Sequence, residues 1–163
     1  MATCRLLTSI LVFTLCISFS PAKGGILSPQ ETIRQSNEEI LSLYLIDQDN
    51  KGDVSEAIFS VMDRVTDFAA IAEATLSAVC PPSGNSTCRA IQDEFVELLK
   101  HSATAKLGRY RAERFDYLQE ETGKETSTVY TTAYFEQDAV SLNYVLKKDG
   151  DTWRIINYIV DEI

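Results

Sequence analysis

The sequence predicts an α+β fold in which N-terminal helices pack on one face of a four-stranded antiparallel meander sheet. Apolar residues recur every three or four positions up to about residue 110, whereas they alternate from residue 114 onward. Helices followed by strands favour helices packed on an antiparallel sheet over a parallel α/β arrangement. The length of 163 residues suits one domain with one sizeable core.

The first 22 residues have the anatomy of a secretory signal. Arg5 is the only charge before Lys23, residues 6–19 form a mainly apolar run, and Ser20 and Ala22 are small residues before a cleavage point. The run is shorter than the roughly 20 residues that a membrane span needs, so a retained anchor is the less favoured alternative. We predict a signal peptide over residues 1–22 and a single domain over residues 23–163.

The predicted mature chain is acidic. Removing Arg5 leaves 14 Lys and Arg against 24 Asp and Glu, so its net charge is 14 − 24 = −10. Such a balance argues against binding to nucleic acid or to an anionic membrane.

Capping signals and apolar stripes locate the helices. Ser28 to Glu31 form a capping box with Pro29 at the first helical position, which predicts a helix over 29–46. Two more helices are expected over 54–65 and 66–79, the latter capped by Thr66 or Asp67. The first and the longest (88–110) carry apolar stripes: Ile33, Ile40, Leu41, Tyr44 and Leu45, and Ile91, Phe95, Leu98, Leu99, Leu107 and Tyr110.

Four alternating segments predict the strands, over 114–121, 126–137, 140–148 and 152–160. Asp149–Gly150 is a strong hairpin signal between the last two. The final strand is apolar on both faces, through Trp153, Ile155, Ile156, Tyr158, Ile159 and Val160. Such a strand indicates a sheet that either packs on helices or lines a cavity.

Two cysteines remain once the signal is removed. Cys80 and Cys88 flank a short loop rich in Pro, Ser and Gly, which in an oxidising compartment predicts a disulfide. The chain-entropy estimate for so small a loop is about 2–3 kcal/mol. Two thiols and a distant histidine, His101, do not make a metal site, and no cofactor motif is present.

The segment from Asp47 to Ile58 partly matches a calcium-binding EF-hand loop. Asp47, Asp49 and Asp53 occupy ligand positions, but Lys51 stands where an oxygen ligand belongs and Ile58 stands where the bidentate Glu belongs. A solvated loop between helices is therefore the favoured interpretation.

One stretch opposes the acidic average. Residues 100–114 carry five cations (Lys100, Lys106, Arg109, Arg111 and Arg114) and one acid, Glu113. These cations complement a helix C-terminus, or alternatively form a basic lip that meets an anionic headgroup or an acidic partner. The pair Glu120–Glu121 is expected to be solvated, and His101 to lie at the surface or partly packed.

The order of these motifs resembles the MlaC, or toluene-tolerance, family of periplasmic phospholipid carriers that serve an ABC transporter. Asp67 and Phe68 match the opening of a family helix, and Tyr144 with the hairpin from Gly150 to Trp153 matches the late strands, with one extra residue between Gly150 and Trp153. The long helix matches at Phe95, Leu98, Leu99, Leu107 and Tyr110. The likeness covers about residues 60–161. It departs from the family at Ala103, usually a large aromatic, and at Asn157, usually Asp.

The resemblance implies a non-catalytic carrier with a cystatin-like or nuclear-transport-factor-like cone, working in lipid transport that maintains outer-membrane lipid asymmetry. Its implied partners are phospholipid, an inner-membrane ABC transporter complex and an outer-membrane lipoprotein complex. The family continues past the last strand into helices that help to cover the lipid, whereas this sequence ends at Ile163. Two alternatives follow from the resemblance: the chain encloses a full phospholipid by itself, or it needs a partner to do so. Apolar residues expected to line the lipid cavity are Phe59, Phe68, Ile71, Phe95, Leu99, Val129, Leu142, Tyr144, Trp153 and Ile155.

Two other functions stay open on sequence grounds. Cone-shaped folds of this kind also host isomerases and dehydratases, which need a carboxylate with Tyr or His at the floor, and candidates are Asp116, Tyr117, Tyr130, Tyr134 and Tyr144. A calcium-binding interaction module built on the Asp47 loop is the second alternative.

Overall fold

The computed structural model describes residues 25–50, 54–80, 85–109, 111–136 and 138–162. These residues form an α+β fold in which the strands follow one another as an antiparallel meander of order β1-β2-β3-β4, so the predicted fold class is confirmed. None of the described helices is long and apolar enough to cross a bilayer. The elements are α1 (Pro29–Asn50), α2 (Ser55–Val65), α3 (Phe68–Leu76), α4 (Ser86–Arg109), β1 (Arg114–Thr122), β2 (Thr126–Tyr134), β3 (Ala139–Asp149) and β4 (Thr152–Glu162).

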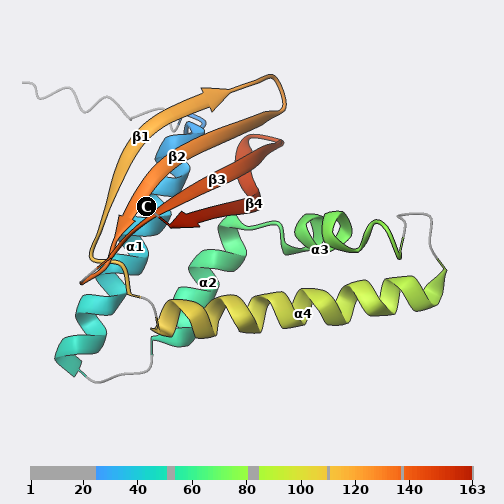
Figure 1. Ribbon diagram of the computed structural model, residues 1–163, viewed down its shortest axis with the longest axis horizontal. Helices are drawn as coiled ribbons and strands as arrows, with labels where there is room; N and C mark the ends of the chain where they lie inside the picture. The colour runs from blue at the N-terminus through green and yellow to red at the C-terminus, as the bar shows by residue number, and fades with distance from the viewer. Residues whose placement is uncertain (1–24, 51–53, 81–84, 110, 137, 163) are drawn as a thin grey trace, which may run out of the picture.

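Helix α1 lies along the inner face of the sheet, against β1 and β2 (Figure 1). The predicted cap is present, because the Glu31 amide donates to Ser28 Oγ at 3.1 Å. A second cap comes from far along the chain: the Gln30 amide donates to Glu120 Oε2 at 2.7 Å. The expectation that Glu120 is merely solvated is therefore wrong, because its carboxylate fixes the start of α1 to β1.

The connection between α2 and α3 is attached to β4. Thr66 forms a parallel bridge with Ile155, and the Asp67 amide donates to the Ile155 carbonyl at 2.8 Å. Asp67 then caps α3 by accepting from the Ala70 amide at 2.9 Å. Both helices are thus positioned by the last strand.

Arg154 strengthens this attachment, and its removal is expected to destabilise the protein. One guanidinium nitrogen, Nη2, donates to the carbonyls of Thr66 (2.6 Å) and Asp63 (3.3 Å) at the end of α2. Hydrogen bonds from a charged donor contribute about 1.5–3 kcal/mol, so we expect Arg154→Ala to lower the free energy of unfolding by about that amount. Urea unfolding measures it, and Lys147→Ala, an exposed change on the neighbouring strand, is the control; equal losses would contradict the assignment.

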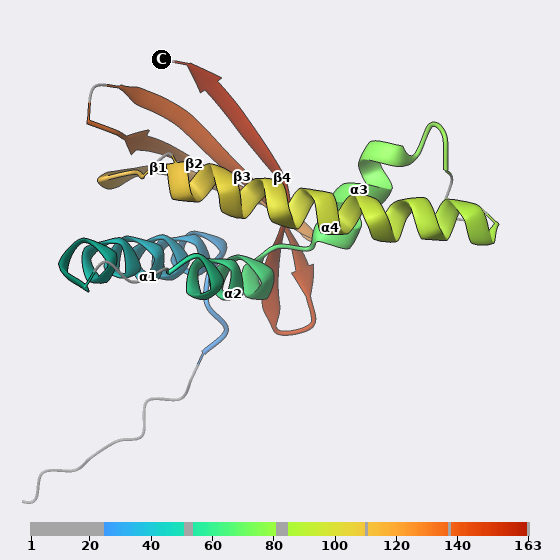
Figure 2. The ribbon, with the colours of Figure 1, turned by 90° about the horizontal axis from the view of Figure 1, so that it is seen from below.

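Helices α3 and α4 pack together and extend beyond the edge of the sheet (Figure 2). The predicted disulfide joins Cys80, just after α3, to Cys88 in the first turn of α4, with the two Cα atoms 5.2 Å apart. Helix α3 ends at Leu76, three residues earlier than predicted, and α4 begins at Ser86, two residues earlier, where Asn85 accepts from the Cys88 amide.

Two bulges change the pattern of the sheet. The register shifts between Tyr117 and Gln119 on β1, which leaves Leu118 67% exposed. On β4 the extra residue is Ile156, since Leu146 pairs with Ile155 but Val145 pairs with Asn157. As a result Ile155 and Tyr158 lie on the same face of β4 although they are three positions apart.

The compact core lies between α1 and the middle of the sheet. It consists of buried side chains from α1 and from the inner faces of β2, β3 and β4: Ile33, Val129, Tyr144, Leu146, Trp153 and Ile155. Leu142 and Tyr158 are partly buried against it, and beyond them the packing opens into a cavity.

Candidate functional site

A cavity of about 390 Å³ lies between the helices and the inner face of the sheet. All four helices and all four strands contribute to its wall. The lining residues are Ile33, Ser36, Asn37, Ile40, Leu41, Tyr44, Met62, Val65, Phe68, Ile71, Leu99, Ser102, Ala103, Lys106, Ala112, Phe115, Ala133, Phe135, Leu142, Tyr144, Ile155, Tyr158 and Val160.

The wall is overwhelmingly apolar. Among the described residues that line it there is no Asp, Glu or His, although the sequence holds 24 acidic residues. Its ionisable side chains are three tyrosines and Lys106. A cavity of this size, with a few polar groups in an apolar wall, has the general character of a small-molecule site.

Two polar residues of the lining, Asn37 and Tyr144, are hydrogen-bonded to each other. Asn37 of α1 is buried; its Nδ2 donates to Tyr117 Oη at 3.1 Å, and its Oδ1 accepts from Tyr144 Oη at 3.3 Å. Because these groups already have partners, an apolar ligand that covers them leaves no polar group newly unpaired.

Burial raises the pKa of the tyrosines that line the cavity. Burial raises the pKa of Tyr144 far above its usual range and raises that of Tyr44 to about 12, opposed for Tyr44 by the nearby Arg111. It also raises the pKa of Tyr158 to about 12, against a smaller opposite effect of the hydrogen bond with Thr66 Oγ1 at 2.7 Å. At neutral pH these residues therefore present hydroxyl groups and rings, not phenolates.

The raised pKa values predict a loss of stability at alkaline pH. An unfolded tyrosine ionises near pH 10, whereas folded Tyr158 stays neutral until about pH 12, so its stabilising contribution is complete below pH 10 and declines as the pH rises towards 12. We expect the free energy of unfolding to fall less steeply over this range in Tyr158→Phe than in the wild type. Urea unfolding from pH 8 to 11.5 measures the two slopes, and identical slopes would contradict the prediction.

The opening of the cavity lies between α4 and β4. Three of its lining residues are exposed: Ser102 and Lys106 on α4, and Val160, 61% exposed, on β4. Helix α4 packs mainly on α3 and α2 and makes few contacts with the sheet, below which it runs in the view of Figure 1. The cavity is lined both by α4 and by the sheet.

Six of the ten predicted lining residues lie on this cavity: Phe68, Ile71, Leu99, Leu142, Tyr144 and Ile155. The other four lie elsewhere among the described side chains. Val129 and Trp153 belong to the compact core, because they lie on the part of the sheet that is filled by Ile33 and Leu146. Phe59 lies beside the Lys100 amine (5.8 Å from its ring centroid), and Phe95 is half-buried on α4.

Sequence reasoning missed the contribution of α1 to the cavity. The stripe predicted for this helix included Ile33, Ile40, Leu41 and Tyr44, which do line the cavity, but these residues were not among those expected to line it. Asn37 falls on the same side at helical spacing, and a polar residue within an apolar stripe is the signal that could have found the site. Leu45 was expected on the stripe but is 63% exposed.

The residues considered for catalysis do not come together. Asp116, Tyr130 and Tyr134 lie on the outer face of the sheet, since they alternate with inward residues along their strands. There Asp116 pairs with Arg114, and Tyr130 donates to Glu121. Only Tyr117 and Tyr144 face inward, and His101 is exposed on α4.

The calcium hypothesis falls largely outside the described residues. The side chains of Asp47 and Asp49 are not described, nor are residues 51–53. Helix α1 continues to Asn50 rather than ending at 46, which makes the backbone of the first ligand positions helical. The described part of the chain contains no group of three or more metal-ligating side chains.

Comparison with known families gives a match to the MlaC protein family over residues 30–163. The chain belongs to the MlaC family. This match confirms the resemblance inferred from the helix and hairpin motifs. No curated protein matches the sequence significantly.

A solved structure shares the fold of this MlaC family member. The phospholipid-binding protein from Ralstonia solanacearum, determined in complex with a phospholipid, superposes with a TM-score of 0.67 at 18% sequence identity, over 84% of this chain and 80% of that one. A DUF4783 family protein from Bacteroides ovatus covers 42% of this chain and 62% of its own with a TM-score of 0.38 at 18% identity.

Proposed function

We propose that this protein is a periplasmic carrier that binds one phospholipid in the cavity and passes it between membrane-bound complexes. The observation that carries the proposal is the cavity itself, about 390 Å³ in volume and walled by apolar side chains from every element. Membership of the MlaC family and the phospholipid-bound structure of the Ralstonia protein support a lipid-binding role.

The physical requirement on a carrier is that burial of acyl chains offsets their extraction from a membrane. Each buried methylene contributes about 0.8 kcal/mol, so a wall with no carboxylate and with satisfied polar groups favours chains over water. An opening between α4 and the sheet gives the chains an entry along one side, and leaves a headgroup at the surface.

The partners follow from the family rather than from the site. We propose that an inner-membrane ABC transporter complex and an outer-membrane lipoprotein complex exchange lipid with the protein. Export through a signal peptide at residues 1–22 would place the chain in the periplasm, and the Cys80–Cys88 disulfide suits that oxidising compartment.

An enzyme of the isomerase or dehydratase type is less well supported. Such chemistry needs a base near the substrate, and the described cavity wall has neither a carboxylate nor a histidine. Burial raises the pKa values of its tyrosines Tyr144 and Tyr158, so neither supplies a phenolate base at neutral pH.

The test is to purify the protein from the periplasm without detergent and to record native mass spectra with lipid extraction. We expect one diacyl phospholipid for each chain. A bare mass that persists after incubation with phospholipid vesicles would contradict the carrier proposal.

A further inference from the structure

We propose that Lys106 forms an anion-binding subsite at the cavity opening, which selects phospholipids whose headgroups carry a net negative charge. The inference rests on the proposed function and adds to it a preference among headgroups. It starts from the five cations between residues 100 and 114, whose surroundings differ in the folded protein.

Two of these cations are paired away from the opening. The Lys100 amine lies 3.1 Å from Asp63 Oδ1 and also contacts Glu97, and Arg114 pairs with Asp116 on the outer face of the sheet. The side chain of Arg109 lies outside the described residues. Of the described side chains in this group, Lys106 lines the cavity, and Arg111 contacts the ring of the lining residue Tyr44.

Lys106 lines the cavity and is exposed, so its amine reaches the surface where the opening meets solvent. Around it the wall is apolar: Ala103 precedes it by one helical turn, and Val160 lies across the opening. Among the described residues of the lining, Lys106 is the one charged side chain, and it is a cation in a chain of net charge −9.

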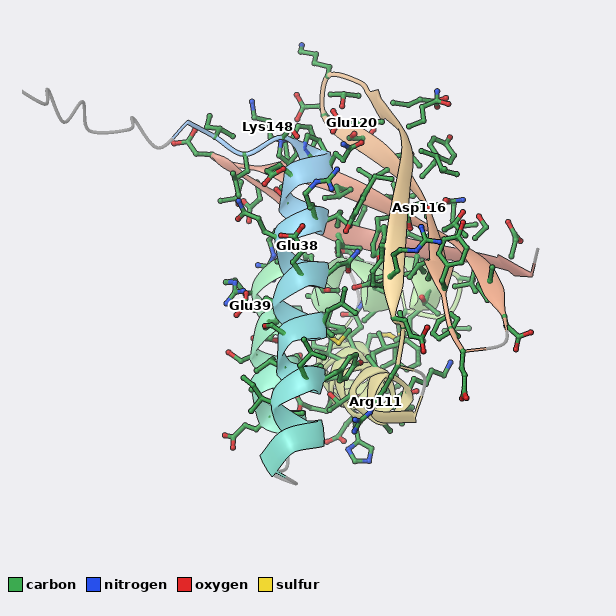
Figure 3. The ribbon with its side chains drawn as sticks, turned by 90° about the vertical axis from the view of Figure 1, so that its left-hand side faces the viewer. Glu38, Glu39, Arg111, Asp116, Glu120 and Lys148 are labelled. Atoms are coloured by element: carbon green, nitrogen blue, oxygen red, sulfur yellow. A yellow bond between two sulfur atoms is a disulfide. The ribbon has the colours of Figure 1, made fainter. Side chains whose placement is uncertain are left out.

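Arg111 is a second cation close to the lining. Its guanidinium carbon lies 5.2 Å from the ring centroid of Tyr44, a lining residue, and its neighbour Ala112 also lines the cavity. Figure 3 labels Arg111 at the α4 end of the molecule, whereas Lys148 lies towards the opposite end of that view.

The ligand chemistry follows from this placement. Acyl chains in the apolar cavity leave the phosphodiester at the opening, within reach of the Lys106 side chain. A zwitterionic headgroup brings its own ammonium to this phosphate, whereas an anionic headgroup leaves the phosphate free to pair with the lysine. The subsite therefore favours phosphatidylglycerol over phosphatidylethanolamine.

The experiment loads lipid-stripped full-length mature protein from vesicles that contain equal amounts of phosphatidylglycerol and phosphatidylethanolamine. Native mass spectrometry then gives the ratio of the two bound lipids. We expect the wild type to be enriched in phosphatidylglycerol, Lys106→Gln to lower the ratio about two- to fivefold, and Lys106→Glu to lower it further. Raising the salt to 0.5 M should move the wild-type ratio towards that of Lys106→Gln, because screening weakens the pair.

Lys148→Gln is the matched control, since it removes the same charge from an exposed position remote from the opening. An equal ratio in wild type and Lys106→Gln, with both proteins loaded, would overturn the subsite and leave the carrier function standing. An equal shift in Lys148→Gln would overturn it too, because net charge alone would then explain the preference. Absence of lipid from every protein would instead reject the carrier function.

Discussion

Replacing Leu99 with glutamate is expected to remove the bound phospholipid, whereas the same change at the adjacent Leu98 leaves it in place. Leu99 lines the cavity from α4, while Leu98 is 61% exposed on the outer side of the same helix. A carboxylate against acyl chains must lose its hydration without gaining a partner, which costs several kcal/mol. Since 1.4 kcal/mol is a factor of ten, we expect lipid occupancy of Leu99→Glu to fall about tenfold or more.

The two variants are closely matched. Both replace the same residue type, both add one negative charge to the same helix, and leucine and glutamate have similar helix propensity. Native mass spectrometry of protein from the periplasm gives the occupancy, and circular dichroism checks the fold. Retention of lipid in both variants would show that this cavity is not the binding site, and loss in both would indicate a general effect of charge on α4.

Local signals in the sequence were sufficient to predict most of the fold. Ser28 caps α1 as predicted, and Asp67, one of the two residues considered, caps α3. Both caps could be predicted because a cap depends on atoms only a few residues away. The last hairpin turns where Asp149–Gly150 predicted, and Gly150 has a φ of 57°, a left-handed conformation that glycine adopts readily. The disulfide followed from spacing and compartment alone.

The inner face of β4 could not be predicted, because a bulge interrupts its alternation. A strict period of two places Trp153 and Ile155 on one face, with Tyr158 and Val160 on the other. The extra residue at Ile156 brings Tyr158 and Val160 round to the inner face, where they line the cavity. One inserted position, which a single sequence does not mark, therefore explains why Tyr158 and Val160 are apolar, whereas Ile159 stays on the other face and is 40% exposed.

The other features that could not be predicted depend on contacts between residues far apart in the sequence. Glu120 caps α1 from 90 residues away, and Tyr144 reaches Asn37 across 107 residues. Neither pairing leaves a spacing pattern in the sequence, because the residues meet only when α1 packs on the sheet. The division between filled core and open cavity depends on the same packing, which is why Val129 and Trp153 were assigned to the cavity but lie in the core.

The boundary between the filled core and the open cavity crosses the inner face of β3. Substitution of two leucines of this strand is therefore expected to have different effects on stability. Leu146 is fully buried in the compact core, whereas Leu142, four residues earlier on the same face, lines the cavity. We expect Leu146→Ala to lower the free energy of unfolding of the lipid-free protein by about 2–5 kcal/mol, the usual cost of removing a core leucine. Leu142→Ala should cost about 1–2 kcal/mol, because on its cavity side there are no packed atoms to lose.

Lipid binding should reduce the difference between the stability losses of Leu146→Ala and Leu142→Ala. Bound lipid stabilises the folded state according to its affinity, and acyl chains in contact with Leu142 lose that contact in the alanine variant. The gain in stability on loading should therefore be unchanged in Leu146→Ala and smaller by about 1 kcal/mol in Leu142→Ala. Urea unfolding of each protein, lipid-free and loaded, measures both quantities. Equal costs at the two positions without lipid would mean that the cavity closes when it is empty, and that the lipid must open it by separating α4 from the sheet.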